Sequence, residues 1–166
     1  MITLVLGGAR SGKSMIAERL AGRHAAPVTY VATMAVGDDT DLGVRVAAHQ
    51  ARRPAQWTTI EAGDGLIRTL RRLTGTALVD SLASWLAAQP DMIVDAQALC
   101  SVLLDRRGDT VIVSDEVGLS VHPSSASGRL FRDALGSLNQ AVASVADATL
   151  LVVAGRVLSL GPLEDC

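Results

Sequence analysis

ITLVLGGARSGKS, residues 2–14, joins an aliphatic run to a glycine-rich loop. Residues 7–14 fit the pattern G-x-x-x-x-G-K-[ST], and an amphipathic helical pattern follows over residues 13–23. In this setting glycines let backbone N–H groups turn onto a polyphosphate, and the helix N-terminus favours negative charge. Lys13 would reach the β- and γ-phosphates, and the Ser14 hydroxyl would bind Mg²⁺. The alternative is an ordinary glycine turn with an exposed lysine. We therefore expect a nucleoside-triphosphate site at Gly7, Gly8, Ala9, Arg10, Ser11, Gly12, Lys13 and Ser14.

Beyond this stretch, strand and helix patterns alternate along the chain, which predicts a doubly wound α/β sandwich. The phosphate loop makes it P-loop NTPase-like (RecA-like), with a mostly parallel sheet, helices on both faces and active groups at the carboxyl ends of the strands. We expect one domain over residues 1–166, because no linker or repeat interrupts the pattern. Strands are expected at residues 2–6, 28–32, 57–61, 76–80, 110–116 and 148–155, with a short edge strand at 156–160. Helices are expected at residues 41–53, 65–75, 81–89, 92–107 and 128–146.

The composition favours a globular protein with an aliphatic core and argues against a nucleic-acid-binding or membrane protein. Hydrophobic residues make up 49% of the chain and aromatic residues only 2%, so aliphatic side chains must fill the interior. The net charge of −2 gives no general attraction to nucleic acid or to an anionic membrane. No apolar run reaches the length of a membrane helix, and the N-terminus does not read as a signal peptide. The two cysteines, Cys100 and Cys166, lie far apart and do not have the spacing of a metal site. A cytoplasmic protein is expected.

A P-loop site needs an acid at the end of a neighbouring strand, and two positions compete for that role. Asp80 ends the run TALVD, and Asp115 with Glu116 ends the run TVIVSDE. By pattern alone the second position fits better, because an aliphatic run followed by Asp-Glu is a common ATPase arrangement. For either position the alternative is an N-cap of the element that follows.

The segment RVAAHQARRPAQW, residues 45–57, holds a single histidine among arginines. By spacing alone His49 is either a solvated residue of an amphipathic helix or a nucleophile beside cationic side chains. An imidazole with an ordinary pKa of about 6.5 is mostly neutral at physiological pH, as a nucleophile must be. Arg52 and Arg53 would disfavour the imidazolium form further and would bind phosphate oxygens bidentately.

Six blocks of the sequence together resemble the bifunctional adenosylcobinamide kinase / adenosylcobinamide-phosphate guanylyltransferase family of cobalamin biosynthesis. They are GGARSGKS (7–14), YVAT (30–33), RVAAHQARRPAQWTTIE (45–61), LVDSLASWL (78–86), SDEVGLSVHP (114–123) and RLFRDALGSLNQAVASVAD (129–147). The phosphate loop is common to a large superfamily. The block around His49 and the pair E-V-G-x-x-x-x-P and F-R-D-x-x-G-x-x-N-Q are far more specific. The resemblance spans nearly the whole chain.

The resemblance implies an enzyme with two activities. It would phosphorylate the aminopropanol hydroxyl of adenosylcobinamide with ATP or GTP. It would then transfer GMP from GTP to the new phosphate through a guanylyl-histidine, which gives adenosylcobinamide-GDP and releases pyrophosphate. Mg²⁺ is the implied cofactor, and a homotrimer is the implied assembly.

The resemblance also implies roles for individual residues. The guanylylated histidine falls on His49, with Lys13 as the other catalytic residue. It favours Asp80 over Asp115 as the acid near the metal, together with Ser14, and position 115 is typically Asn in the family. The further nucleotide contacts that it implies are Thr33, Met34, Ala35, Gln50, Ala51, Arg52, Arg53, Glu61 and Asp80.

Three other functions compete with this interpretation. A plain P-loop kinase of a small metabolite would share Lys13 and Asp80 and leave His49 structural. A nucleotide-dependent switch would be expected to contain a guanine-specificity motif such as N-K-x-D, which the sequence lacks. A nucleic-acid ATPase is disfavoured by the acidic charge balance and the scarcity of aromatic residues.

Overall fold

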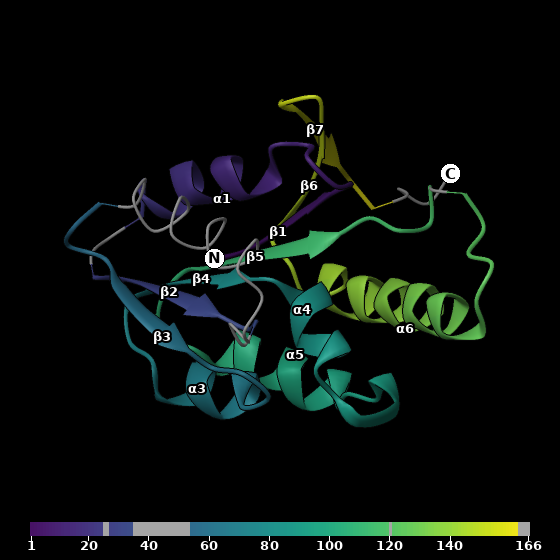
Figure 1. Ribbon diagram of the computed structural model, residues 1–166. Coiled ribbons are helices and arrows are strands. Elements are labelled where there is room, and N and C mark those ends of the chain that lie inside the picture. The colour runs from purple at the N-terminus through teal and green to yellow at the C-terminus, as the bar shows by residue number, and fades with distance from the viewer. Residues whose placement is uncertain (25–26, 35–53, 120, 163–166) are drawn as a thin grey trace.

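The computed structural model describes residues 1–24, 27–34, 54–119 and 121–162, which are built around a seven-stranded sheet (Figure 1). The sheet order is β3-β2-β4-β5-β1-β6-β7, and every neighbouring pair is parallel except β6 with β7. The strands are β1 (Ile2–Gly7), β2 (Val28–Ala32), β3 (Thr58–Glu61), β4 (Thr76–Asp80), β5 (Thr110–Asp115), β6 (Ala148–Val153) and β7 (Arg156–Leu160).

Helices cover both faces of this sheet. Helix α1 lies on one face, and α3, α4, α5 and α6 lie on the other (Figure 1). The predicted doubly wound, mostly parallel sheet with helices on both faces is therefore confirmed. The helices are α1 (Lys13–Ala21), α3 (Leu66–Arg72), α4 (Leu82–Ala87), α5 (Ala96–Asp105) and α6 (Ala126–Ala143), with a 3₁₀ turn η1 (Pro90–Met92) before α5.

The aliphatic strands supply two cores because successive side chains of a strand point to opposite faces. In β1, Leu4 belongs to the core under α3–α6, and its neighbour Val5 belongs to the core under α1. In β5, Ile112 and Val113 divide in the same way. A strand that is buried on both faces reads as a continuous aliphatic run, which is why composition pointed to this architecture.

Two predicted helix starts are wrong by a few residues. The helix expected from residue 92 begins at Ala96, because the carboxylate of Asp95 accepts the N–H of Ala98 at 2.8 Å and so caps it. Met92 has a φ of 54°, which a right-handed helix does not accommodate. The last helix starts two residues earlier than expected, since Ser125 caps it by accepting the N–H of Gly128. The helix predicted over residues 41–53 lies outside the described residues.

The edge strand predicted at residues 156–160 is confirmed as β7, which pairs antiparallel with β6. Ala154 and Gly155 form the connecting turn and have φ values of 50° and 71°. Positive φ at both central residues is the geometry of a type I′ hairpin turn. The N–H of Gly155 donates to the carbonyl of Ser11 at 2.8 Å, so this turn supports the phosphate loop from the side of the sheet edge.

The parallel register gathers the carboxyl ends of the first six strands at one edge of the sheet. The phosphate loop follows β1 at that edge, beside the end of β5, and the ends of β4, β2 and β3 follow in order. Crevices at this edge are where doubly wound sheets bind ligands. Among the described residues, no helix is both long enough and apolar enough to cross a membrane.

Candidate functional site

The phosphate loop runs from the end of β1 into α1. Gly12 precedes the helix with a φ of 95°, and Arg10 also has a positive φ of 57°. No side chain caps α1 at Gly12, so the dipole and the first amides of the helix are directed at the loop. This backbone arrangement suits an anion at the helix N-terminus.

The loop is packed closely against the end of β1. A Cβ atom on Gly7 would lie 2.5 Å from Oγ of Ser11 and 2.7 Å from the carbonyl oxygen of Val152. Real Cβ atoms do not approach other atoms this closely, so the first glycine of the motif is required by space rather than by backbone angle. Ser11 is buried, and its Oγ accepts the N–H of Lys13 at 3.3 Å.

Lys13 is held by an acid from the neighbouring strand. Its Nζ lies 2.6 Å from Oδ1 of Asp115 and also donates to the carbonyl of Gly8 at 3.2 Å. The contact follows from the register, since Gly7 and Asp115 are paired across β1 and β5. The side chain of Lys13 is 13% exposed and that of Asp115 is 33% exposed, so the ion pair is partly shielded from water.

Asn139 of α6 fixes the end of β5 from the other face of the sheet. Its Oδ1 accepts the hydroxyl of Ser114 at 2.6 Å, and its Nδ2 donates to the carbonyl of Asp115 at 3.0 Å. Asn139 is only 7% exposed. Buried polar groups are expensive unless they are hydrogen-bonded, and this amide meets that requirement on both of its ends.

Asp80 lies one strand further along the same edge, and a separate network surrounds it. Oδ2 of Asp80 accepts the hydroxyl of Tyr30 at 2.8 Å. The buried hydroxyl of Thr33 donates to the carbonyl of Ser81 at 2.6 Å and accepts the N–H of Ser81 at 2.9 Å. The N–H of Thr33 also donates to the carbonyl of Asp80 at 3.3 Å. Thr33 and Asp80, both expected from the resemblance, are thus brought together.

The cap interpretation of Asp80 is wrong. The side chain that caps α4 belongs to Ser81, which accepts the N–H of Ser84 at 3.2 Å. At the second candidate position, Glu116 accepts the N–H groups of Gly118 and Leu119, while Asp115 pairs with Lys13. Both aspartates are therefore left with their carboxylates at the ligand-binding edge.

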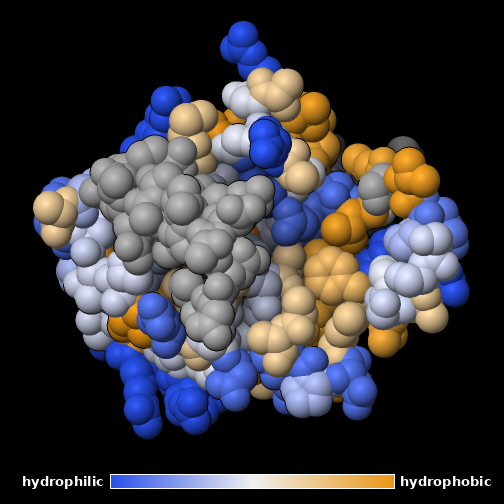
Figure 2. Space-filling view, viewed as in Figure 1, coloured by the Kyte–Doolittle hydropathy of each residue, from blue (hydrophilic) through white to orange (hydrophobic). Residues whose placement is uncertain are grey.

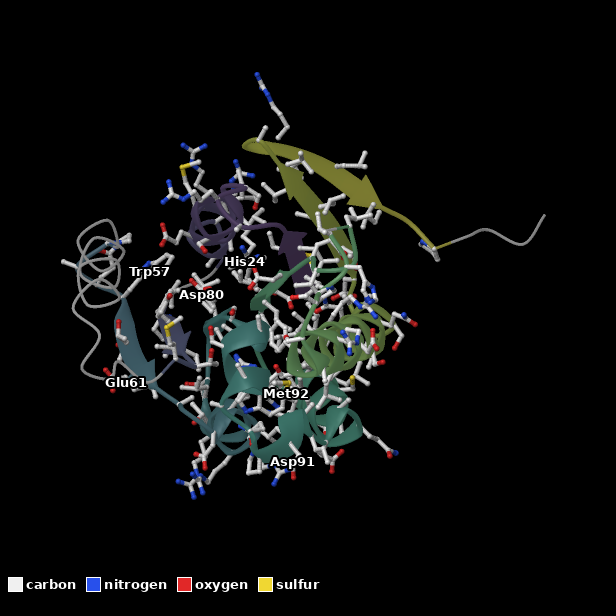
Figure 3. All side chains as sticks on the ribbon, turned by 45° about the vertical axis from the view of Figure 1, so that its right-hand side comes forward. His24, Trp57, Glu61, Asp80, Asp91 and Met92 are labelled. Carbon is white, nitrogen blue, oxygen red and sulfur yellow. The ribbon has the colours of Figure 1, made fainter. Side chains whose placement is uncertain are left out.

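The remaining expected contacts are spread more widely. Glu61 is exposed at the end of β3, and Figure 3 shows it and Trp57 further out than Asp80. Met34 is 39% exposed just beyond β2. His49, with the other expected residues Ala35, Gln50, Ala51, Arg52 and Arg53, lies outside the described residues.

No ready-made metal cage is found in the described part of the chain, since no three His, Cys, Asp or Glu side chains cluster there. Mg²⁺ at a nucleotide site does not need one, because it is commonly held by one or two protein oxygens together with the phosphates and water. Ser14 in the first turn of α1 and Asp80 at the end of β4 provide hard oxygen donors of that kind.

Sequence reasoning missed two residues of this site. Tyr30 falls within the predicted strand at residues 28–32 and was given no role of its own, yet its hydroxyl donates to Asp80. Asn139 lies among Leu135, Leu138 and Val142, which form the buried stripe of α6. A polar residue inside an apolar helical stripe was the available signal, because such a residue must find a buried partner.

Comparison with known proteins identifies relatives along nearly the full chain. The family model described as cobinamide kinase / cobinamide phosphate guanyltransferase matches residues 3–160. A bifunctional adenosylcobalamin biosynthesis protein of Pseudomonas aeruginosa is 40% identical, and the match covers 96% of this chain and 97% of the relative. A protein of the same description from Salmonella typhimurium is 33% identical, with coverages of 93% and 97%.

Solved structures with low sequence identity share the fold. The flagellar accessory protein FlaH from Methanocaldococcus jannaschii matches with a TM-score of 0.52 and 14% identity over 94% of this chain and 74% of that protein. The ATPase EscN of the enteropathogenic Escherichia coli type III secretion system matches with a TM-score of 0.55 and 12% identity, over 92% of this chain and 43% of that protein. These likenesses agree with the P-loop NTPase-like architecture expected from residues 7–14.

Proposed function

The chain belongs to the cobinamide kinase / cobinamide phosphate guanyltransferase family, and from that premise we propose that it carries out both reactions. It phosphorylates adenosylcobinamide with ATP or GTP and then transfers GMP from GTP to adenosylcobinamide phosphate. The observation that carries the proposal is a phosphate loop between β1 and α1, in a chain that matches the family from residue 3 to residue 160. The relatives named as bifunctional adenosylcobalamin biosynthesis proteins support the same assignment.

The kinase half uses the phosphate loop. The amides of residues 7–14 bind the phosphates, and Lys13 balances the charge on the β- and γ-phosphates. Phosphoryl transfer needs mostly positioning and charge stabilisation, which a rigid loop packed at Gly7 and Ser11 supplies. Ser14 and Asp80 would hold Mg²⁺, which lowers the charge on the transferred group when it is bound. Tyr30 and Thr33 orient Asp80 and the backbone that follows it.

The guanylyltransferase half uses His49 as the nucleophile. In its neutral form the imidazole attacks the α-phosphorus of GTP, pyrophosphate leaves, and the phosphoramidate then passes GMP to the corrinoid phosphate. Arg52 and Arg53 would bind phosphate oxygens in this step, while Ala35, Met34, Gln50, Ala51 and Glu61 would contact the nucleotide. The support for these roles is the resemblance of residues 45–61 to the family.

Self-association into a homotrimer is part of the proposal. The β6–β7 hairpin leaves Val157, Leu158 and Leu160 at the surface, and apolar side chains reach the surface at the top of Figure 2, where Figure 1 places β7. A hollow of about 870 Å³ lies between this hairpin and α6. Contiguous exposed apolar side chains are typical of protein interfaces, which supports placing a subunit contact at this hairpin. We also propose that the assembled enzyme works in the cytoplasm.

The guanylyl-histidine step is tested with α-³²P-labelled GTP and Mg²⁺. Acid-labile, alkali-stable label on the protein is expected for the wild type and is expected to disappear in His49→Ala. His24→Gln is the matched control, since His24 lies at the opposite edge of the sheet beside Asp109 and should not affect labelling. Equal label on wild type and His49→Ala would contradict the nucleophile. An unlabelled wild type that phosphorylates a small metabolite would favour the plain kinase.

A further inference from the structure

Lys13 is the only lysine among the 166 residues of the chain. Every other cationic side chain of fixed charge is an arginine, so a single ammonium group serves the phosphate loop. In the structure this group is engaged by Oδ1 of Asp115 at 2.6 Å and by the carbonyl of Gly8 at 3.2 Å. Hydrogen bonds between an ammonium and a carboxylate are short and strong compared with neutral ones.

The residue that holds Lys13 has an anchored backbone. Asp115 is the last residue of β5, and its backbone is bound on one side by the register with Gly7. On the other side Asn139 donates to its carbonyl and also accepts the hydroxyl of Ser114. Asp115 therefore presents its carboxylate to the loop from an anchored strand end.

A triphosphate at this loop requires the same ammonium. The lysine of a phosphate loop reaches the β- and γ-phosphates, so Lys13 must exchange a carboxylate for phosphate oxygens when nucleotide binds. The fixed negative charge of Asp115 then lies close to the negative charges of the phosphates, which repel it. Both effects act against nucleotide binding.

We propose that Asp115 is an affinity-setting residue of the nucleotide site, which holds Lys13 in the empty protein and competes with the phosphates for it. The proposal rests on the nucleotide site proposed above and adds a second role to it. Asp115 holds the Lys13 ammonium beside the phosphate loop. The same contact lowers the affinity of the protein for a nucleotide.

The test measures GTP binding by isothermal titration calorimetry in EDTA, where no metal contributes and no turnover occurs. Asp115→Asn preserves the shape of the side chain and removes its charge. We expect it to bind GTP about three- to fivefold more tightly than the wild type, the upper part of the range for loss of one partly exposed ion pair. Asp115→Ala is the second variant and is expected to change the affinity in the same direction.

Glu116→Gln is the matched control, because it removes the same charge one residue away and keeps an acceptor for the N–H groups of Gly118 and Leu119. Its affinity should stay within about twofold of the wild type, since Glu116 does not contact Lys13. Equal tightening by Glu116→Gln would show a general charge effect and would overturn the proposal. Unchanged or weaker binding by both Asp115 variants would also overturn it.

The single lysine allows a direct second measurement. Protein grown with ¹³C-labelled lysine has one ε-methylene NMR signal, which reports on Lys13 alone. We expect this signal to differ between the free wild type and free Asp115→Asn, and the difference to shrink when GTP saturates both. Coincident signals in the free proteins would overturn the proposal. Absence of GTP binding by every variant, with and without Mg²⁺, would instead overturn the nucleotide site itself and the proposal with it.

Discussion

The phenolic hydroxyl of Tyr30 donates to Oδ2 of Asp80 at 2.8 Å and so ties neighbouring strands at the ligand-binding edge of the sheet. Ala32 is the register partner of Asp80, so Tyr30 lies two residues upstream on the same face. Tyr30 is the only tyrosine of the chain and is buried. This contact fixes the orientation of Asp80, the acid that is expected to face the metal and the phosphates.

Tyr30→Phe removes this donor and keeps the ring in place. Hydrogen bonds to charged groups contribute about 1.5–3 kcal/mol, so we expect the free energy of unfolding to fall by about 1–2 kcal/mol for this partly buried pair. The kcat/KM for phosphoryl transfer should fall by about three- to tenfold, because Asp80 loses its orientation. A double-mutant cycle with Asp80→Asn measures the coupling, and strictly additive effects would contradict it.

Gly7→Ala and Gly136→Ala form a matched pair of glycine substitutions. At Gly7 the new methyl group meets Ser11 and the carbonyl of Val152, so we expect a loss of about 1–3 kcal/mol in stability and at least about tenfold weaker GTP binding. At Gly136, inside α6, a Cβ atom has nothing within 4 Å, and alanine should raise stability by about 0.5–1 kcal/mol. Thermal unfolding and GTP titration check both, and a neutral Gly7→Ala would contradict the packing of the loop.

Lys13→Ala should abolish phosphoryl transfer to adenosylcobinamide, with kcat reduced by at least about a hundredfold, because the loop loses its only ammonium charge. Arg19→Ala is the control, since it removes one positive charge from the exposed side of the same helix α1. Initial rates with ATP and with GTP provide the measurement. Retained activity in Lys13→Ala would remove the phosphate loop from the kinase reaction.

Asp109, at the opposite edge of the sheet, should make stability depend on pH. The N-terminal ammonium at 2.9 Å, and then His24 at 3.0 Å, hold the pKa of Asp109 below its ordinary value. A lowered folded-state pKa stabilises the fold above the unfolded-state value of about 3.9, and this contribution is lost as the pH falls through the folded-state value.

Asp109→Asn should therefore be less stable than the wild type near pH 7, by less than about 1 kcal/mol because the pair is partly exposed. The difference should shrink toward zero as the pH falls through the lowered folded-state pKa of Asp109. Asp105→Asn, which removes an exposed carboxylate at the end of α5, is the control and should show no such trend. Urea unfolding at several pH values measures the difference, and a gap that persists at low pH would contradict the assignment.

The order of elements was predictable from the sequence because aliphatic runs and helical spacing are local signals. Which acid meets Lys13 was not, because that depends on the order of strands in the sheet. β5 lies beside β1, so Asp115 meets the lysine, and Asp80 lies one strand away. Both acids end an aliphatic run in the sequence, and no local feature states which run is the neighbour.

Helix starts were harder to predict where two signals conflict. The run Met92–Val94 reads as the beginning of an amphipathic helix. The next residue, Asp95, is however the N-cap, so the helix begins at Ala96. The role of Asn139 depends on contacts with β5, more than twenty positions away, so spacing within α6 does not reveal its partners.

The hairpin turn at Ala154–Gly155 contributes to the shape of the phosphate loop. The amide of Gly155 holds the carbonyl of Ser11, and a Cβ atom on Gly12 would lie only 3.4 Å from the α-carbon of Gly155. A protein shortened just before this turn would keep every residue of the GxxxxGKS signature and lose the brace behind it. The signature alone therefore does not determine the shape of the loop, because a hairpin far along the chain braces it.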